Sequence, residues 1–208
     1  MGCTVISISR TLAAGGEEIG RDVAARLGFR FVDDEIVSRA AEKAGVSPQM
    51  IEKVERTLPL IERILKNIGT APVESAAYIP PQGHHSPDYE SLIEQVIRQT
   101  AAQGNVVIVA HGASIPLAGT PGLLRVLVTG SPESRIARLA ASLGMDGRRA
   151  KKAVEDSDRE RRDYFQRFYN IRGELPTHYD IVLNTDVLSL TTAANVIAAA
   201  AEAGAAPA

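Results

Sequence analysis

The chain has a single cysteine, no tryptophan and few aromatic residues of any kind. Only 4% of its 208 residues are aromatic, and Cys3 is the one cysteine. A single cysteine excludes an internal disulfide framework and a zinc site built from several cysteines, and it suits a reducing, cytoplasmic compartment. With so few aromatic side chains, a base-stacking platform for RNA or single-stranded DNA is a poor hypothesis.

An excess of charge of one sign and long apolar runs are also missing. The 23 basic and 25 acidic residues give a formal net charge of −2, which provides no generally basic surface for nucleic acid. No stretch approaches the roughly 18 uninterrupted apolar residues of a membrane span, and the first residues lack the pattern of a secretion signal. We therefore expect a soluble cytoplasmic protein that binds neither nucleic acid nor a membrane.

The residues that are present favour one α/β domain. Hydrophobic residues make up 45% of the chain and charged residues 23%, as in ordinary globular proteins, and the length is sufficient to bury a core. Hydrophobic periodicity predicts five short strands separated by helices, over residues 4–9, 29–32, 105–110, 123–129 and 179–184. The segment 105–110 is almost continuously apolar, which is typical of a strand buried on both faces. The pattern predicts a five-stranded parallel sheet flanked by helices.

The loop after the first strand is the first candidate for a ligand site. It runs from Ser9 to Gly16 and precedes a helix that we expect to span residues 17–27. Parallel sheets bind ligands where the carboxyl ends of strands meet helix N-termini, and small residues there let backbone amides approach a phosphate. A tight turn without any ligand explains Gly15 and Gly16 equally well at this stage.

The order of these segments resembles that of the P-loop nucleoside monophosphate kinases, specifically the cytidylate kinase-like family. The matching stretches span nearly the whole chain: residues 6–10, 15–16, 19–20, 27–28, 33, 106–109, 158–164 and 179–185. The resemblance implies a helical insertion that binds a nucleoside monophosphate, over about residues 34–88, and a mobile lid over about residues 143–175. The core would then consist of residues 1–33, 89–142 and 176–204.

The same resemblance implies where substrates bind. ATP would lie on the first loop and be held by Arg10, Ala13, Ala14, Gly15, Gly16 and Glu17. Mg²⁺ would bridge the donor phosphates largely through water, without a protein metal site. A CMP-type or dCMP-type acceptor would lie near Asp33, Arg39 and His111, although Asp33 and Asp34 are equally compatible with simple helix caps.

A cluster of charge marks the expected lid. Between residues 148 and 167, eight basic and five acidic side chains leave a charge of +3 in a chain of net −2. Lid arginines position and neutralise a transferred phosphoryl group, and the resemblance assigns this role to Arg161 and Arg162. Asp158 lies three residues before Arg161, a spacing that allows its carboxylate to orient the guanidinium. For most charges in this window, a solvated helix with surface salt bridges is the simpler interpretation.

The first loop departs from a complete P-loop. In the P-loop register, Arg10 takes the position of the first glycine and Gly16 that of the lysine, while Glu17 and Glu18 follow where small or hydroxyl residues are usual. These carboxylates compete with a phosphate for the helix N-terminus, and Arg10 would supply the missing cation. His111 also replaces an expected arginine. Two hypotheses remain open: a kinase that transfers phosphate from ATP, or a nucleotide-binding or regulatory module with impaired catalysis.

Overall fold

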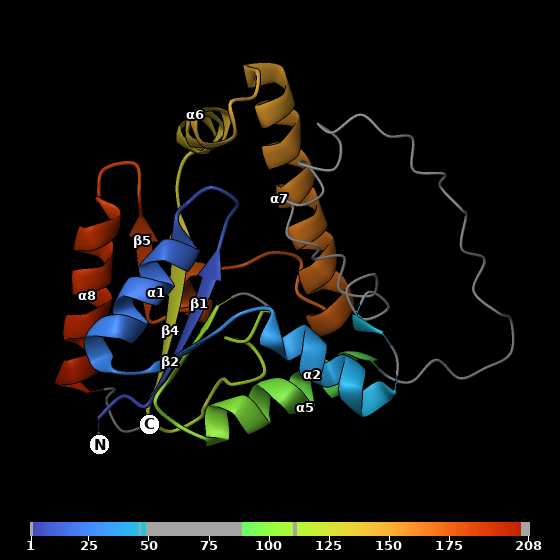
Figure 1. Ribbon diagram of the computed structural model, residues 1–208, viewed down its shortest axis with the longest axis vertical. Coiled ribbons are helices and arrows are strands. Elements are labelled where there is room, and N and C mark those ends of the chain that lie inside the picture. Colours follow the sequence, from blue (N-terminus) through green and yellow to red (C-terminus); the bar gives the residue numbers. More distant parts are fainter. Residues whose placement is uncertain (1, 46, 49–88, 110–111, 205–208) are drawn as a thin grey trace, which may run out of the picture.

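The computed structural model describes residues 2–45, 47–48, 89–109 and 112–204, and its centre is a parallel sheet (Figure 1). Five strands pair in the order β2-β3-β1-β4-β5, and each neighbouring pair is parallel. Their bounds are Val5–Arg10 (β1), Arg30–Val32 (β2), Val106–Val109 (β3), Leu123–Thr129 (β4) and Ile181–Asn184 (β5). The predicted five-stranded parallel sheet is confirmed.

Helices cover both faces of the sheet, as the sequence predicted. Helices α1 (Gly16–Leu27) and α8 (Leu190–Ala203) pack on one face, and α2 (Glu35–Ala44) and α5 (Tyr89–Ala102) pack on the other (Figure 1). Most of the predicted insertion over about residues 34–88 lies outside the described residues. Two further helices, α6 (Pro132–Leu143) and α7 (Gly147–Tyr169), extend beyond the end of the sheet where β1 stops.

Alternating side chains on the central strand explain why both faces need a helical layer. Ile6 and Ile8 are fully buried with Val23 of α1 and Ile197 of α8, whereas Val5 packs with the layer of α2 and α5. All four residues of β3 are fully buried, as the continuous apolar run predicted. A strand with apolar side chains on both faces is stable only between two layers, so this pattern specifies the three-layer arrangement.

The C-terminal end of α7 is anchored by aromatic side chains. Tyr164 stacks on Phe168 with ring centroids 4.3 Å apart, and Phe165 is 1% exposed. Tyr169 closes over Gly112, where a Cβ would lie 2.8 Å from the Tyr169 ring. Four of the nine aromatic residues of the chain therefore hold one helix end against the loop that follows β3.

The described helices are either too short or too polar to cross a bilayer. The longest of them, α7, has 23 residues and is rich in charge, and the alanine-rich α8 has 14 residues. In the part of the chain that the structure describes, no helix is both long and apolar enough to cross a membrane.

A short 3₁₀ helix, η1 (Pro176–His178), precedes the last strand. The segment between α7 and η1 brings the chain back from the end of α7 to the sheet, and Glu174 lies within it. The return is fixed at its end by Asp180, whose carboxylate accepts two hydrogen bonds from the Arg125 guanidinium at the start of β4. This connection holds Glu174 against Ser9 of β1 and Arg161 of α7.

Candidate functional site

The loop between β1 and α1 leaves the N-terminus of α1 open. Gly15 precedes the helix with φ 82, in the left-handed region that favours glycine, and no side chain caps the first turn. Ala13 also has a positive φ, of 60. The first amides of a helix have no intrahelical partner. The turn therefore presents uncapped amides at the carboxyl end of the central strand.

The carbonyl groups of the same loop are held by the protein itself. Arg138 donates to the Ala13 carbonyl at 3.4 Å, and the hydroxyl of Thr185 donates to the Ala14 carbonyl at 3.1 Å. Arg138 also donates to the Thr185 hydroxyl at 2.8 Å, and Thr185 is buried. Leu12 and Ala13 pack against the apolar contact between α6 and α7. The loop is thus fixed from behind while its helix N-terminus stays open.

Arg10 lies beside this N-terminus and is paired with Glu17. Its Nη2 donates to Glu17 Oε1, and both side chains are partly exposed. The stem of Arg10 crosses Gly16 so closely that a Cβ at position 16 would lie 2.6 Å from the Cβ of Arg10. Its Nε is buried and has no hydrogen-bond partner among the described residues. The Arg10 guanidinium therefore lies at the start of α1, paired with the Glu17 carboxylate, and its Nε donor is unsatisfied within the described residues.

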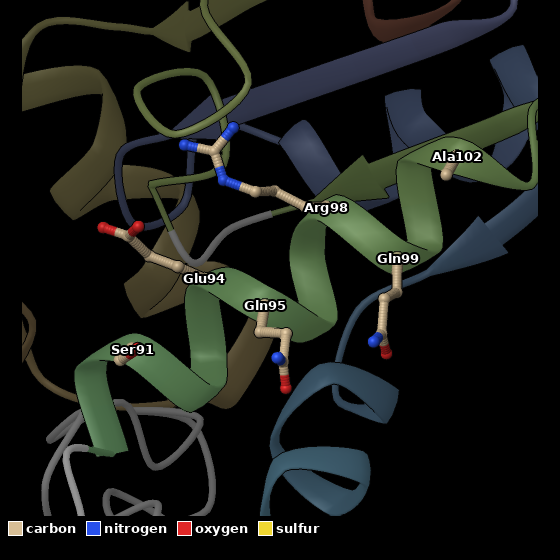
Figure 2. Close-up of a pocket in the computed structure, with 6 residues that line it drawn as sticks. All are labelled: Ser91, Glu94, Gln95, Arg98, Gln99 and Ala102. Carbon is tan, nitrogen blue, oxygen red and sulfur yellow. The ribbon is translucent and has the colours of Figure 1, made fainter.

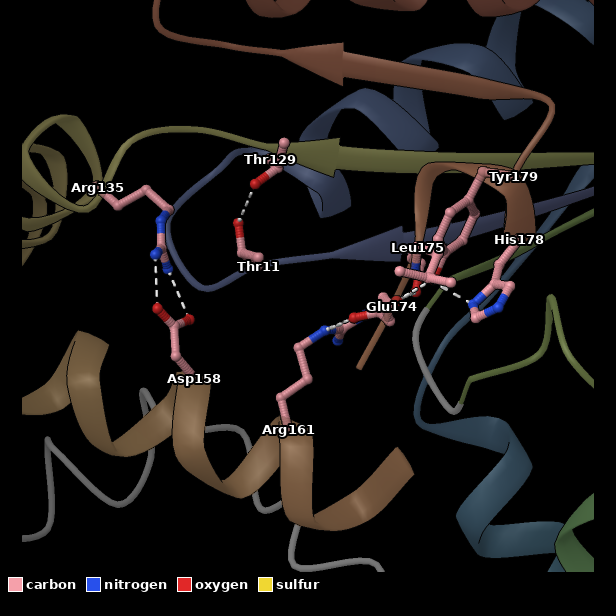
Figure 3. Close-up of polar contacts among 10 residues, drawn as sticks. Thr11, Thr129, Arg135, Asp158, Arg161, Glu174, Leu175, His178 and Tyr179 are labelled. Atoms are coloured by element: carbon pink, nitrogen blue, oxygen red, sulfur yellow. Dashed lines mark hydrogen bonds and ion pairs between the residues drawn. The ribbon is translucent and has the colours of Figure 1, made fainter. Parts of the chain in front are cut away.

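Arg161 of α7 reaches the end of β1, next to the first loop (Figure 3). Its Nη2 donates to Ser9 Oγ at 2.7 Å and to Glu174 Oε1 at 2.8 Å, and its Nε donates to the other oxygen of Glu174. The hydroxyl of Tyr179 donates to the same carboxylate. Ser9 is buried, so the network fixes the guanidinium of Arg161 at the carboxyl edge of the sheet.

The predicted pairing of Asp158 with Arg161 is wrong. Asp158 accepts two hydrogen bonds from Arg135 of α6, at 2.9 and 2.7 Å (Figure 3). Arg135 is 3% exposed and its Nε also donates to the Gly130 carbonyl at 3.0 Å. A buried guanidinium needs acceptors for all its donors, and Asp158 provides two of them. The carboxylate therefore braces α7 against α6.

Arg162, the other predicted lid arginine, is exposed. It forms no hydrogen bond or ion pair with any residue within the described ranges. Because it follows Arg161 directly on α7, the helix turns its side chain to a different side. The structure thus separates the two arginines into one that is held at the sheet edge and one that faces solvent.

The predicted acceptor residues are only partly brought together. Arg39 of α2 donates to the buried Thr100 hydroxyl of α5 at 2.9 Å and lies 3.7 Å from the Glu35 carboxylate. Asp33 follows β2 and its carbonyl accepts from the Ile36 amide, which starts α2. His111 lies outside the described residues. A role for these residues in binding an acceptor stays a prediction.

Sequence reasoning missed Arg135, Arg138, Glu174 and Thr185 as components of this region. One signal for Arg135 was available, because it precedes the buried Leu139 by four residues and so puts a charge on the apolar face of a helix. Thr185 directly follows a parallel strand, where site residues gather. For Glu174, in an irregular segment, the sequence carries no comparable signal.

Other features of the described chain do not form a competing site. No group of three or more histidine, cysteine, aspartate or glutamate side chains gathers where a metal ion could be held, as far as the described residues go. A pocket runs along α5 (Figure 2), and the described residues that line it all belong to that helix: Ser91, Glu94, Gln95, Arg98, Gln99 and Ala102. Gln95 already accepts a hydrogen bond from Lys43 of α2 at 2.9 Å. This pocket has no backbone donors or converging cations comparable with those at the first loop.

Comparison with known proteins connects this geometry to a family. Residues 5–187 match the sequence model of the cytidylate kinase-like family. Similar folds occur in an uncharacterized protein from Eubacterium ventriosum (TM-score 0.63, 16% identity, 93% of this chain and 95% of that one) and in shikimate kinase from Bacteroides thetaiotaomicron (TM-score 0.51, 13% identity, 93% and 96%). At these identities the likeness concerns the fold alone. No curated protein matches the sequence.

Proposed function

The chain belongs to the cytidylate kinase-like family, and from that premise we propose that it transfers a phosphoryl group from ATP to a nucleoside monophosphate, CMP or dCMP in type. One observation carries the proposal: Arg10 lies beside the uncapped N-terminus of α1, and Arg161 is held on Ser9, the residue before Arg10, at the carboxyl edge of the sheet. Uncapped amides and guanidinium groups are the donors that phosphates require.

The donor nucleotide would bind through the first loop. Gly15 and Gly16 add no side chain of their own at the first amides of α1, and the Arg10 stem that crosses Gly16 brings a cation to the same turn. Ala13 and Ala14 would contribute only backbone groups, because their side chains are methyl groups. Arg138 and Thr185 already donate to their carbonyls. The described residues offer no cluster of ligands for Mg²⁺, so the ion would be held by the phosphates and by water.

The arginines of α7 would act on the phosphoryl group in transfer. Phosphoryl transfer depends mainly on positioning and on neutralising charge on the transferred oxygens. Arg161 already lies at the end of β1, and the exposed Arg162 is free to turn toward a bound substrate. In this proposal residues 143–175 act as the lid and residues 34–88 as the acceptor-binding insertion, with Asp33, Arg39 and His111 near the acceptor.

A second candidate is a nucleotide-binding module without turnover. Two observations favour it: Glu17 occupies Arg10, and Gly16 stands where a complete P-loop has lysine. Such a protein would bind ATP at the same loop but would leave the phosphoryl group in place. The two candidates predict the same ligand and differ only in the reaction.

An ADP-release assay over a panel of nucleoside monophosphates, with shikimate included, tests the proposal. We expect turnover with a pyrimidine monophosphate, and we expect Arg161→Ala to lower kcat about 100-fold. Arg159→Ala is the matched control, because Arg159 lies on the same helix and pairs with Asp156 on the exposed surface.

If no acceptor gave turnover above the Arg161→Ala rate while calorimetry showed saturable ATP binding, the protein would be a nucleotide-binding module without turnover. Absence of both turnover and ATP binding would contradict both candidates.

A further inference from the structure

Arg10 and Glu17 form their ion pair where the phosphates of the donor are proposed to bind. We infer that Glu17 determines which anions this site accepts: its carboxylate occupies Arg10 and yields to a polyphosphate chain but not to a single phosphate. The inference rests on the proposed function, because it concerns the same loop.

The close approach of Arg10 to α1 is made possible by Gly16. A Cβ at position 16 would lie 2.6 Å from the Cβ and 3.2 Å from the Cδ of Arg10. Because Gly16 has no Cβ, the Arg10 stem can cross the first turn of the helix, and its Nη2 donates to Glu17. The pair is therefore a product of the loop geometry rather than a contact between two freely moving surface chains.

The pair leaves Arg10 incompletely satisfied. Glu17 accepts from Nη2, whereas Nε is buried and has no partner among the described residues. The amides at the start of α1 have neither a side-chain cap nor an intrahelical partner. A ligand with several oxyanions would satisfy the guanidinium and these amides together, which the single carboxylate of Glu17 does not do.

A single phosphate gains much less from the exchange. Glu17 is attached to the same helix turn, so its carboxylate competes at a high effective concentration. Inorganic phosphate would replace one anion on Arg10 by another and would reach fewer of the remaining donors. A triphosphate extends across both groups of donors, so its additional contacts outweigh the loss of the Glu17 pair.

Glu18 separates this effect from general electrostatics. It carries the same charge in the same helix turn, but it is exposed and forms no ion pair with a described residue. Its Oε2 lies 3.4 Å from the position of a Cβ on Gly15. Neutralising Glu18 therefore changes the local charge without vacating the guanidinium.

Titration calorimetry with ATP, tripolyphosphate and inorganic phosphate tests the inference on the full-length wild type, Glu17→Gln and Glu18→Gln. We expect Glu17→Gln to bind ATP and tripolyphosphate about fivefold more tightly and to acquire measurable affinity for inorganic phosphate. Glu18→Gln should stay within about twofold of the wild type. In an Arg10→Gln background, Glu17→Gln should give no gain, since the cation that Glu17 occupies is absent.

Two results would overturn the inference while leaving the proposed function in place. They are equal gains from Glu17→Gln and Glu18→Gln, and a gain from Glu17→Gln that persists with Arg10→Gln. Failure of every folded variant and of the wild type to bind ATP would instead contradict the proposed function, and the inference with it. Glu17→Ser, with circular dichroism as the folding check, provides a second neutral variant should Glu17→Gln not fold.

Discussion

Helices α1 and α6 start at the same edge of the sheet, yet one start is open and the other is closed. At α6, the Ser131 hydroxyl accepts from the Ser134 amide at 3.2 Å, and Asp186 accepts from the Ser131 amide at 3.0 Å. At α1, the preceding residue is Gly15, which has no side chain to offer. Side chains satisfy the donors at the start of α6 and leave those at the start of α1 uncapped, which is where the proposed anion site lies.

The contacts at the start of α6 continue to α7, the helix of the proposed lid. Arg135, in the first turns of α6, donates to the Gly130 carbonyl just before the helix and to Asp158 of α7. Helix α8 is closed in the same way, since Ser189 accepts from the Thr192 amide at 3.1 Å. Among the described helices that follow β1, β2, β4 and β5, side chains cap α6 and α8, whereas α1 and α2 have no side-chain cap.

The largest expected effect is on the closed side, from Asp158→Ala. It leaves the buried Arg135 guanidinium without its carboxylate, and we expect the free energy of unfolding to fall by about 2–4 kcal/mol. Urea denaturation followed by circular dichroism measures this. Asp156→Ala on the same helix is the control, because Asp156 pairs with the exposed Lys152 and should cost less than about 1 kcal/mol. Equal costs would show that Arg135 does not depend on Asp158.

The second-largest expected effect is the loss of ATP affinity caused by Gly16→Ala at the uncapped start of α1. The added Cβ would lie 2.6 Å from the Cβ of Arg10, so the arginine must move, and we expect ATP affinity to fall about tenfold or more. Gly147→Ala is the matched control, since Gly147 also starts a helix and a Cβ there meets nothing within 4 Å. If calorimetry gave both variants wild-type ATP affinity, the close approach of Arg10 to Gly16 would not matter for ATP binding.

Ser131→Ala sharpens the comparison from the closed side. Loss of the N-cap should lower the free energy of unfolding by about 1 kcal/mol, and ATP affinity should not change. Thermal unfolding and calorimetry measure the two quantities. Ser142→Ala, near the other end of α6, removes a hydroxyl that donates only to the Leu139 carbonyl and should have a smaller effect. A fall in ATP affinity with Ser131→Ala would mean that the two helix starts share a ligand.

The smallest effect concerns pH. The backbone N–H of Ser131 is the main cause that lowers the pKa of Asp186 below its ordinary value. A carboxylate with a lowered pKa in the folded state stabilises the protein above its unfolded pKa of about 3.9, and this stabilisation is lost as the pH falls through the folded pKa. Asp186→Asn should therefore be slightly less stable at neutral pH and should converge with the wild type in acid.

Melting temperatures measured from neutral pH down to acid follow this change. A difference between the two proteins that stayed constant across the range would contradict the assignment to Asp186.

The fold could be predicted because its signals are local. The apolar run at 105–110 and the helix expected over residues 17–27 both correspond to observed elements. Periodicity and capping act over a few residues, so one sequence is sufficient to recognise them. The position of the first loop followed from the same reasoning, since it lies between the first strand and the first helix.

The pairing of charges could not be predicted in this way. The spacing of Asp158 and Arg161 predicted a contact on one helix, but such surface pairs contribute only about 0.5 kcal/mol or less. Arg135 is buried and requires acceptors, so its demand for Asp158 outweighs that preference. The partners lie 23 residues apart, and Arg161 and Ser9 lie 152 apart, which only the tertiary fold brings together.

The way the first loop is fastened has a consequence for the rates of binding. Arg138 and Thr185 hold its carbonyls, and Leu12 packs into the contact between α6 and α7, so the loop is ordered before a ligand arrives. Little conformational entropy remains to be lost on binding. The association rate constant should therefore be set by diffusion and electrostatic attraction. Differences in affinity between anions should appear in the dissociation rate constant.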